Sequence, residues 1–425
     1  MNVHDSERIG GLLGGAGYLP AQTVAETDLV VINTCSVRER AEEKLFSRLN
    51  HYRNVKRKNR PMIVVTGCVA QQESHNIIER APMVDVVIGT QALAKLPEAI
   101  EFARETGNPH IDINQYDNVS FPLGLALRQD NVKAFVTIIE GCNDFCAFCV
   151  VPYTRGHERM RPALEIIEEI KQLAQQGYRE VHLLGQIVNH YHAPDIKNCN
   201  FSDLLNRVHA ISGIDRIRFA SPHPRHVSQE MINVMRDLPK VCKHLHLPVQ
   251  SGSTPVLSRM RRRHTRERYL QLVEEIKSAI PTISLSTDII VGFPGESDVD
   301  FNATLSLIEQ VQYQNIFSFK YSERPNTLAS QRMPETVTEE EKTCRLTELQ
   351  SLQKHRQLAL HENMIGQQVE VLVDAQSRRR IDEYTGRTDG NTIVNFPATG
   401  SCVGKIMRIT VMRAGPNSVW GIATN

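Results

Sequence analysis

The sequence predicts an α/β protein in three parts: an open α/β sheet domain over residues 1–110, a partial (βα)6 barrel over 128–358 and a small all-β barrel over 361–425. Three patterns carry this prediction. Apolar runs alternate with helical patterns at the start, six strand–helix repeats follow, and short alternating runs make up the last part. A chain of 425 residues has room for two or three domains of roughly 150 residues each.

The N-terminal part is expected to form a small parallel sheet. Continuous apolar runs at 28–33, 62–66 and 84–88 are typical of strands that are buried on both faces. A helical pattern over 38–50 separates the first two strands. The chain opens directly on a helical segment at 5–13, so one βα unit is expected to lack its strand.

A longer strand–helix alternation follows a loop-like boundary at 105–132, which is rich in Gly, Pro, Asn and Asp. The first helix of this region is expected over 162–176. Six such repeats predict a parallel barrel with its function at the carboxyl ends of the strands. The expected strands are 135–139, 181–184, 216–219, 244–247, 284–291 and 316–320.

The C-terminal part has a different texture. A charged helical stretch over 338–362 leads into short alternating runs that are broken by Gly and Asn turns from Gly366 onward. About 60 residues of this kind predict a small all-β barrel of the oligonucleotide-binding type.

Composition narrows the functional class. The net charge of +1 excludes a uniformly basic surface and leaves only local patches for a nucleic-acid partner. No apolar run reaches the roughly 18 residues of a membrane span, and a signal-peptide core is absent, so we expect a cytoplasmic protein with no membrane partner. Nine cysteines, spread over a long chain, favour metal or redox chemistry over a disulfide framework.

The sharpest motif is a C-x3-C-x2-C triplet, Cys142, Cys146 and Cys149, directly after the first expected barrel strand. Three thiolates within eight residues can hold one face of a 4Fe-4S cluster and leave the fourth iron open to a substrate or cofactor. The alternative is a zinc site that borrows a distant fourth Cys or His.

Two further cysteines lie just beyond strand ends in the N-terminal part. Cys35 follows the strand at 28–33, and Cys68 follows the strand at 62–66. If these strands are neighbours in a parallel sheet, both thiols emerge at the edge where such sheets keep their sites. The sequence therefore predicts a second metal-ligating group there, although two cysteines at strand ends also occur by chance.

With these residues in view, the whole chain resembles the methylthiotransferase family of radical S-adenosylmethionine enzymes. The resemblance rests on the cysteine triplet and on segments such as 33–39, 141–156, 245–253 and 288–296, with Gly386-Arg387-Thr388 near the end. It implies an N-terminal domain with auxiliary-cluster cysteines, a radical S-adenosylmethionine barrel and a C-terminal TRAM domain that binds RNA.

The resemblance also implies a reaction. Members of this family put a methylthio group on a tRNA adenosine or on a ribosomal protein, and this chain resembles most those that modify C2 of an isopentenyl-adenosine next to the anticodon. One S-adenosylmethionine at the Cys142/Cys146/Cys149 cluster would yield a radical that removes hydrogen from C2. A second would methylate a sulfur on the auxiliary cluster, where Cys35 and Cys68 are ligands. C2–H is unactivated, so radical chemistry is required.

Three departures from the family pattern stand out. The family's first strand ends in a Gly-Cys-Gln-Met-Asn segment with a third auxiliary cysteine, whereas this sequence matches that segment only from Met1. We expect either a start assigned too late or an incomplete auxiliary cluster. Ile187 stands where the family usually has Asn, close to the expected cofactor pocket. The segment 156–162 varies the family's usual Ser-Arg-Pro ending.

The remaining site predictions concern S-adenosylmethionine and RNA. Six polar residues near strand ends are candidates for the cofactor pocket, although each could equally be a hydrogen-bonded barrel residue: Gln186, Asn189, Ser221, His246, Gln250 and Asp288. Basic clusters for RNA are expected at 53–60, at 259–268 and at 378–380 with Arg387, the strongest candidates being Arg261, Arg262, Arg263 and Arg387. By resemblance, the partners are the anticodon stem-loop of tRNA and an electron donor such as flavodoxin or ferredoxin, and the chain is a monomer.

Two alternatives stay open. One is a sister activity, methylthiolation of a threonylcarbamoyl-adenosine or of a ribosomal-protein aspartate. The other is an RNA-binding protein without full activity, which would follow if the auxiliary cluster lacks its third ligand.

Overall fold

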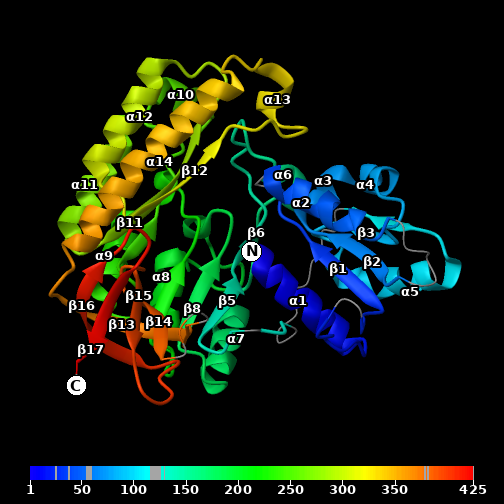
Figure 1. Cartoon of the computed structure of the whole chain (residues 1–425), viewed down its shortest axis with the longest axis horizontal. Helices are drawn as coiled ribbons and strands as arrows, with labels where there is room; N and C mark the ends of the chain where they lie inside the picture. Colours follow the sequence, from blue (N-terminus) through cyan, green and yellow to red (C-terminus); the bar gives the residue numbers. More distant parts are fainter. Residues whose placement is uncertain are drawn as a thin grey trace. The chain divides into compact units, whose positions relative to one another are not determined.

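The computed structural model describes residues 1–23, 26–36, 39–53, 60–114, 126–128, 130–377, 380 and 382–424 (Figure 1). It divides into two units, and each is described by itself. Unit 1 comprises Met1–Gln129, Glu140–Arg159 and Arg324–Ser330, and unit 2 comprises Asp130–Ile139, Met160–Glu323 and Gln331–Asn425. In the described part of the chain, no helix is long and apolar enough to cross a membrane.

Unit 1 is built on a four-stranded parallel sheet in the order β1-β2-β3-β4. Its elements, in chain order, are α1 (Asn2–Gly15), β1 (Leu29–Asn33), α2 (Glu39–Asn50), β2 (Met62–Thr66), α3 (Cys68–Glu73), α4 (His75–Arg80), β3 (Val86–Ile88), η3 (Leu93–Lys95), α5 (Leu96–Thr106), β4 (His110–Asp112) and α6 (Val151–Arg155).

Helices bury both faces of this sheet, and successive strand residues point to opposite faces. On β2, Ile63 and Val65 belong to one apolar cluster with residues of α2 and α4, whereas Val64 belongs to a second cluster with Ile9 of α1 and residues of α5. This two-sided burial explains the continuous apolar runs and confirms the open α/β sheet. The sequence predicted a loop where the fourth strand, β4, lies. This strand is only three residues long, so its sequence pattern is too short to recognise.

Unit 2 contains the strands of the partial barrel, arranged as two three-stranded parallel sheets, β5-β8-β9 and β10-β11-β12. An isolated parallel β-bridge pairs Ile217 of β9, in the first sheet, with Val241, which lies just before β10 of the second sheet. The elements are β5 (Lys133–Thr137), α7 (Ala163–Gln175), β8 (Glu180–Leu184), η4 (Val188–His190), α8 (Phe201–His209), β9 (Arg216–Phe219), η5 (Pro224–His226), α9 (Gln229–Asp237), β10 (His244–His246), α10 (Thr254–Arg259), α11 (Arg266–Ala279), β11 (Ser284–Val291), α12 (Asp298–Val311), β12 (Asn315–Lys320) and α14 (Glu339–Glu362). The short elements β6 (Ile139–Glu140), β7 (Arg159–Met160) and α13 (Leu328–Arg332) each span a point where the chain passes from one unit to the other.

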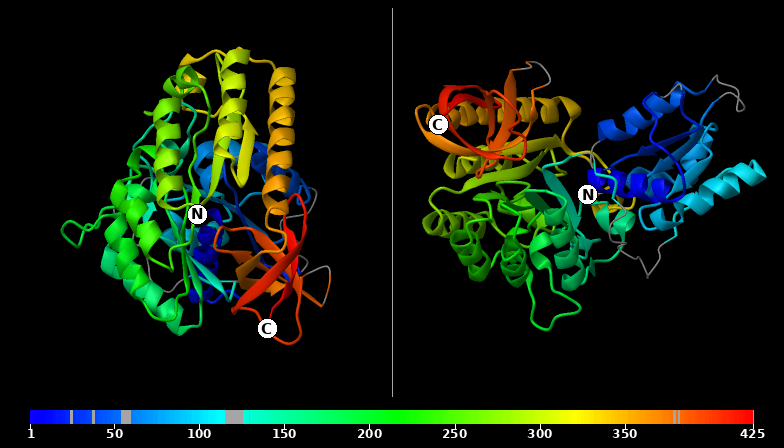
Figure 2. Two further views of the ribbon diagram at one scale, coloured as in Figure 1. Left: turned by 90° about the vertical axis from the view of Figure 1, so that its left-hand side faces the viewer. Right: turned by 90° about the horizontal axis from the view of Figure 1, so that it is seen from below.

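The helices cover one face of these strands. Leu245, Leu285 and Ile289 lie in the main apolar cluster together with residues of the surrounding helices. Figure 2 shows α14 running alongside α12 on this outer side, where α14 also packs on β12. The opposite face of the same strands carries His246 and Asp288 and is therefore the inner surface of the barrel.

The end of the chain forms a closed five-stranded barrel in the order β13-β14-β15-β17-β16, as the alternating pattern predicted. Its strands are β13 (Gln368–Gln376), β14 (Glu383–Thr388), β15 (Ile393–Pro397), β16 (Ile406–Ala414) and β17 (Val419–Ala423). The turn after β14 is bound to the starts of the larger barrel's strands within unit 2. There, Arg218 of β9 donates to the carbonyls of Thr388 and Asp389, and Arg216 donates to the carbonyl of Arg387.

Candidate functional site

The cysteine triplet lies on a tightly folded loop that follows β6. Gly141 begins this loop with a left-handed φ of +82°, and a Cβ atom there would lie 2.1 Å from the carbonyl oxygen of His157. The loop closes on itself through the Cys142 amide, which donates to the carbonyl of Gly156 at 3.2 Å. Only glycine satisfies both demands at Gly141, so the backbone geometry of the loop depends on it.

The three thiols of this loop differ in exposure. Cys142 is buried, whereas Cys146 and Cys149 are half-buried. Burial raises the pKa of the Cys142 thiol to about 12, so this thiol stays protonated until a metal displaces its proton. The Asp144 amide points at the Cys142 sulfur over 3.5 Å, which is the kind of contact that stabilises negative charge on a cluster thiolate.

The second cysteine pair occupies the position that the sequence predicted. β1 and β2 are parallel neighbours, with Asn33 opposite Thr66, so Cys35 and Cys68 follow strands that end at the same edge. The strand ends approach closely, because a Cβ on Gly67 would lie 2.4 Å from the Asn33 side-chain oxygen. Burial lowers the pKa of the Met1 amino group, while the nearby Asp5 carboxylate opposes this shift.

The donor chemistry of both cysteine groups fits iron–sulfur clusters. Thiolates are the usual protein ligands of such clusters. In the part of the chain that the structure describes, no three His, Cys, Asp or Glu side chains are arranged to hold a metal ion. A cluster does not require that arrangement, because each thiolate binds a different iron. The loop at 141–149 therefore fits a three-thiolate cluster site, and the edge with Cys35 and Cys68 supplies two thiols.

The polar residues predicted for the cofactor pocket lie in unit 2, where His246 and Asp288 are on β10 and β11 and Gln250 follows β10. His246 Nε2 lies 3.4 Å from Asp288 Oδ1, and its Nδ1 lies 3.0 Å from the Ser286 hydroxyl. The same hydroxyl lies 3.0 Å from Nε2 of His244, so it donates to one imidazole and accepts from the other. The backbone amide of Gln250 donates to the backbone carbonyl of Asp288, which binds Gln250 to β11.

Two predicted pocket residues have strained backbones. Ser221 and Gln250 are non-glycine residues with φ values of +62° and +77°, and each lies just beyond a strand end. Such left-handed conformations cost about 1–3 kcal/mol and are concentrated at ligand sites. Their position at the carboxyl ends of barrel strands is what a cofactor pocket requires.

Gln186 and Asn189 follow β8 but have different environments. Both polar atoms of the Asn189 carboxamide bind the backbone of His223, at 3.0 and 2.8 Å, so this side chain holds the loop after β9 in place. The Oε1 atom of Gln186 is buried without a hydrogen-bond partner. An orphaned buried acceptor is costly, and its presence indicates a place for a ligand donor. Ile187 is buried beside it.

The sequence did not predict one residue that lies on the inner barrel face. Phe317 of β12 is 43% exposed although it lies in the middle of a strand. It is opposite Asp288 in the strand register, and its ring lies 5.7 Å from the His246 ring in an edge-on arrangement. Period-two alternation in 315–320 already separated Phe317 from the buried Ile316, but the sequence does not show which face points inward.

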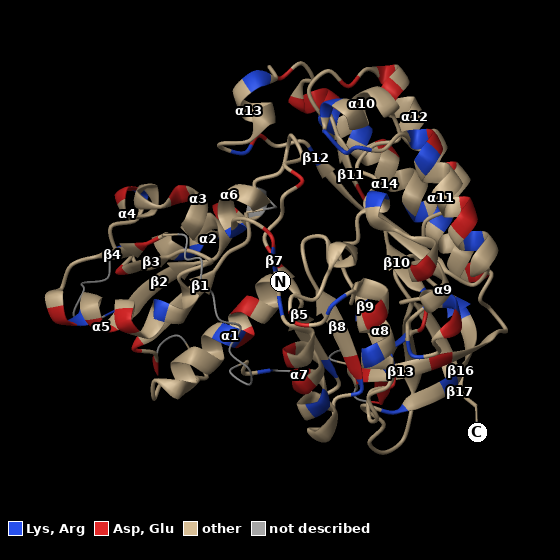
Figure 3. Cartoon of the chain, turned by 180° about the vertical axis from the view of Figure 1, so that it is seen from behind, with Lys and Arg blue, Asp and Glu red and all other residues tan. Residues whose placement is uncertain are grey.

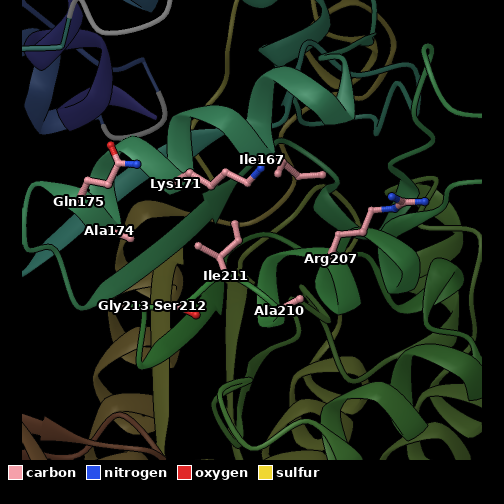
Figure 4. Close-up of a pocket in the computed structure, with 9 residues that line it drawn as sticks. All are labelled: Ile167, Lys171, Ala174, Gln175, Arg207, Ala210, Ile211, Ser212 and Gly213. Atoms are coloured by element: carbon pink, nitrogen blue, oxygen red, sulfur yellow. The ribbon is translucent and has the colours of Figure 1, made fainter.

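A surface cavity of about 690 Å³ lies away from these residues, between α7 and α8 (Figure 4). It is lined by Lys171 and Arg207 and by small and aliphatic residues near the C-terminal ends of the two helices. These helix ends lead into the starts of the barrel strands, opposite the strand ends at which the candidate residues gather.

Comparison with known proteins now decides the family. Three family profiles match in order: "Uncharacterized protein family UPF0004" over residues 1–89, "Radical SAM superfamily" over 136–308 and "TRAM domain" over 362–424. The chain is 44% identical to the tRNA-2-methylthio-N(6)-dimethylallyladenosine synthase of Geotalea uraniireducens, over 99% of this chain and 96% of that protein. A relative of the same name from Yersinia pseudotuberculosis is 43% identical over 99% of this chain and 90% of its own length.

The chain belongs to this family of radical S-adenosylmethionine methylthiotransferases. The resemblance seen in the sequence is thereby confirmed, as are the TRAM domain and the radical barrel. The family implies S-adenosylmethionine and 4Fe-4S clusters as cofactors and tRNA as a substrate.

Solved structures confirm the fold. The radical S-adenosylmethionine methyltransferase TsrM from Kitasatospora setae, with cobalamin and a [4Fe-4S] cluster bound, matches with a TM-score of 0.56. The match covers 78% of this chain and 74% of that one at 15% identity. The cobalamin-dependent radical enzyme OxsB, with aqua-cobalamin bound, matches with a TM-score of 0.51 at 12% identity, over 83% of this chain and 54% of that one.

The basic residues of this methylthiotransferase chain differ in exposure. Lys and Arg gather around α10 and the start of α11 (Figure 3). Arg261 and Arg263 are exposed on the loop after α10. Arg262 is buried between them and donates to the carbonyl of Pro248 at 2.8 Å, which favours a structural role for this residue. Its neighbours Arg259 and Arg266 likewise donate to backbone carbonyls.

The other two basic clusters are only partly described. Residues 54–59 and 378–379 lie outside the described residues. Two arginines of these clusters are described and form ion pairs: Arg60 with Asp85 at 2.7 Å and Arg380 with Glu383 at 2.8 Å. Arg387 is 34% exposed at its side chain, which donates to Asn391 Oδ1 at 3.1 Å and lies 3.6 Å from Asp374. Its RNA-binding role stays a prediction.

Proposed function

We propose that this chain is a tRNA-modifying enzyme that adds a methylthio group to C2 of N6-dimethylallyladenosine next to the anticodon. One observation carries the proposal: 44% identity across 99% of the chain to a relative named for this reaction. The C-x3-C-x2-C loop and the family profiles agree with it.

In this proposal, Cys142, Cys146 and Cys149 hold the radical cluster, and Cys35 and Cys68 supply two ligands of the auxiliary cluster. We assign no cysteine of this sequence as the third auxiliary ligand. The bound radical cluster would supply the electron that cleaves S-adenosylmethionine and so makes removal of the unactivated C2 hydrogen feasible. The protein's own contribution is to hold the cofactor and to keep water away.

The cofactor residues have distinct proposed roles. Gln186 accepts a hydrogen bond from S-adenosylmethionine through its orphaned Oε1. His246, Asp288 and Gln250 form the polar wall of the pocket, in which the Asp288 carboxylate orients the imidazole of His246. Asn189 and Ser221 shape the loops that follow β8 and β9.

Substrate binding is assigned to the TRAM barrel and to the exposed arginines of the α10 loop. Arg261, Arg263 and Arg387 would contact phosphates of the anticodon stem-loop. We further propose a cytoplasmic monomer that receives electrons from flavodoxin or ferredoxin, with domain boundaries at 1–110, 128–358 and 361–425.

The test is anaerobic reconstitution with iron and sulfide, followed by incubation with S-adenosylmethionine and tRNA that carries isopentenyl-adenosine. Nucleoside mass spectrometry should then detect the methylthio product. Two complete clusters correspond to about eight irons per chain, and the triple variant C142A/C146A/C149A should lose about four of them. Cys344→Ala, which changes an exposed cysteine outside both groups, is the control.

Two results would overturn the proposal. One is wild-type protein with iron bound and no methylthio product on this tRNA. The other is product on threonylcarbamoyl-adenosine instead, which would assign the sister activity.

A further inference from the structure

The loop that carries the cysteine triplet is anchored on the carboxyl edge of the N-terminal sheet. Residues 140–159 belong to the same unit as that sheet. The helix α6, which ends the loop, packs against α3, the helix that begins at Cys68. Both cysteine groups are therefore held in one unit, although they are far apart in the sequence.

Two anchors come from the end of β3. The Thr90 hydroxyl donates to the carbonyl of Thr154, and the Gln91 amide nitrogen donates to the carbonyl of Arg155 at 2.9 Å. These carbonyls belong to the last turn of α6, whose carbonyls have no partner within the helix. The approach is close, since a Cβ on Gly156 would lie 2.1 Å from Gln91 Nε2.

The third anchor is a buried ion pair. Arg155 donates to Asp5 of α1 at 2.5 Å, and their side chains are only 8% and 3% exposed. Burial alone would lower the pKa of Arg155, but the charge of Asp5 raises it above its ordinary value. Burial would likewise raise the pKa of Asp5, and the Arg155 charge reverses that effect. Both groups therefore stay ionised.

A buried ion pair of this kind adds little net stability to a fold. Removing two charges from water costs several kcal/mol per ion, and apolar packing of similar volume often stabilises as well. What the pair adds is a fixed link between distant segments, because a short charge-assisted hydrogen bond between two buried groups forms in few orientations. Here a single buried bond, from Arg155 to Asp5 Oδ2, joins α1 to the end of the cysteine loop.

We infer that Asp5 and Arg155 are positioning residues that fix the radical-cluster loop against the auxiliary cysteine edge and thereby couple radical formation to methylthio transfer. The inference deepens the proposed function and rests on it. Loss of the pair should free the loop without abolishing the cluster ligands, so the radical would still form but would be spent unproductively.

The experiment compares Asp5→Asn, Arg155→Met and Arg155→Lys with Arg104→Met. Arg104 is an exposed arginine of α5 in the same unit, paired with Glu101, and serves as the matched control. Thr90→Val is included because it removes an anchor without leaving a buried charge. The first readout is hydrogen exchange of the metal-free protein over 140–156, with the α7 peptide 163–175 as an internal reference. The second is methylthio product per 5′-deoxyadenosine released by the reconstituted enzyme.

We expect Asp5→Asn and Arg155→Met to raise loop exchange about tenfold or more, since hydrogen bonds to charged groups are the stronger ones. The product ratio should fall while 5′-deoxyadenosine still forms, with Arg155→Lys and Thr90→Val intermediate and Arg104→Met unchanged. Unchanged loop exchange, or product and 5′-deoxyadenosine falling in parallel, would overturn the inference. If the wild-type protein makes no methylthio product, the proposed function fails, and the exchange comparison still decides whether the pair fixes the loop.

Discussion

Arg218 of β9 pairs with Glu180 of β8 inside the barrel, with Nε lying 3.1 Å from Oε2 and both side chains at most 4% exposed. The other two nitrogens of the same guanidinium donate to the carbonyls of Thr388 and Asp389 in the small C-terminal barrel. His182 lies 2.5 Å from the remaining oxygen of Glu180. One buried carboxylate thus holds the arginine that joins two domains of unit 2.

The first prediction concerns acid stability. Burial would raise the pKa of Glu180, but the His182 hydrogen bond and the Arg218 charge lower it to about 2. A depressed carboxyl pKa stabilises the fold above the unfolded value of about 4.3, and this contribution is lost as the pH falls toward 2. Glu180→Gln should destabilise the neutral protein by about 3–5 kcal/mol because it leaves Arg218 buried and unpaired.

The measurement is the unfolding temperature of wild type and variant from pH 7 to pH 3. The gap between them should shrink as the pH falls. Asp237→Asn, which breaks an exposed pair with Arg236, should change little. A gap that is constant with pH would refute the linkage.

The second prediction concerns Gly141. Gly141→Ala should prevent cluster assembly at the triplet, because the new Cβ meets the His157 carbonyl in a left-handed backbone. Gly177→Ala is the matched control, since Gly177 has a φ of +94° but nothing within 4 Å of its Cβ position. Iron analysis should show about four irons lost for the first variant only. Equal loss in both would mean that backbone strain alone matters.

The third prediction concerns Gln186. Gln186→Met removes a buried acceptor that has no partner, so the ligand-free protein should be stabilised by about 1 kcal/mol. The same change should weaken S-adenosylmethionine binding about tenfold, since a ligand hydrogen bond is lost. Calorimetry gives the stability, and equilibrium binding to the reconstituted protein gives the affinity. Unchanged affinity would remove Gln186 from the pocket.

The fourth prediction concerns Phe317. An exposed aromatic ring on the inner barrel face is suited to contact a base or an isopentenyl group. Phe317→Ala should raise the KM for tRNA substrate about tenfold, whereas Phe317→Tyr should retain most of the activity. The comparison uses steady-state kinetics with modified tRNA. If Phe317→Ala forms less 5′-deoxyadenosine than wild type when no tRNA is present, Phe317 contacts the cofactor instead.

The fifth prediction concerns RNA binding. Arg261→Ala with Arg263→Ala should weaken tRNA binding and lower the magnitude of its salt slope by about 1.5, which corresponds to two lost phosphate contacts. Arg236→Ala, on α9, is the control because Arg236 is an exposed arginine outside the three basic clusters. Titrations at several salt concentrations measure the slope. An unchanged slope would reject phosphate contacts by these residues.

Local pattern was sufficient for the element types and the order of the domains, and it is the basis of the predicted cysteine chemistry. Buried strands such as 62–66, the Cys142–Cys149 spacing and the alternating runs after Gly366 all depend on neighbours within a few residues. The three-residue strand β4 was missed because its pattern is too short to be distinguished from a loop.

Contacts between distant residues needed the folded chain. No sequence pattern distinguishes the buried Arg262 from the exposed Arg261 and Arg263, since only packing around Pro248 separates them. The same holds for Asp5 and Arg155, which are 150 positions apart and meet only when α6 packs at the sheet edge. Spacing along the chain specifies which chemistry is available, whereas burial and direction, which arise from long-range packing, specify which side chains can use it.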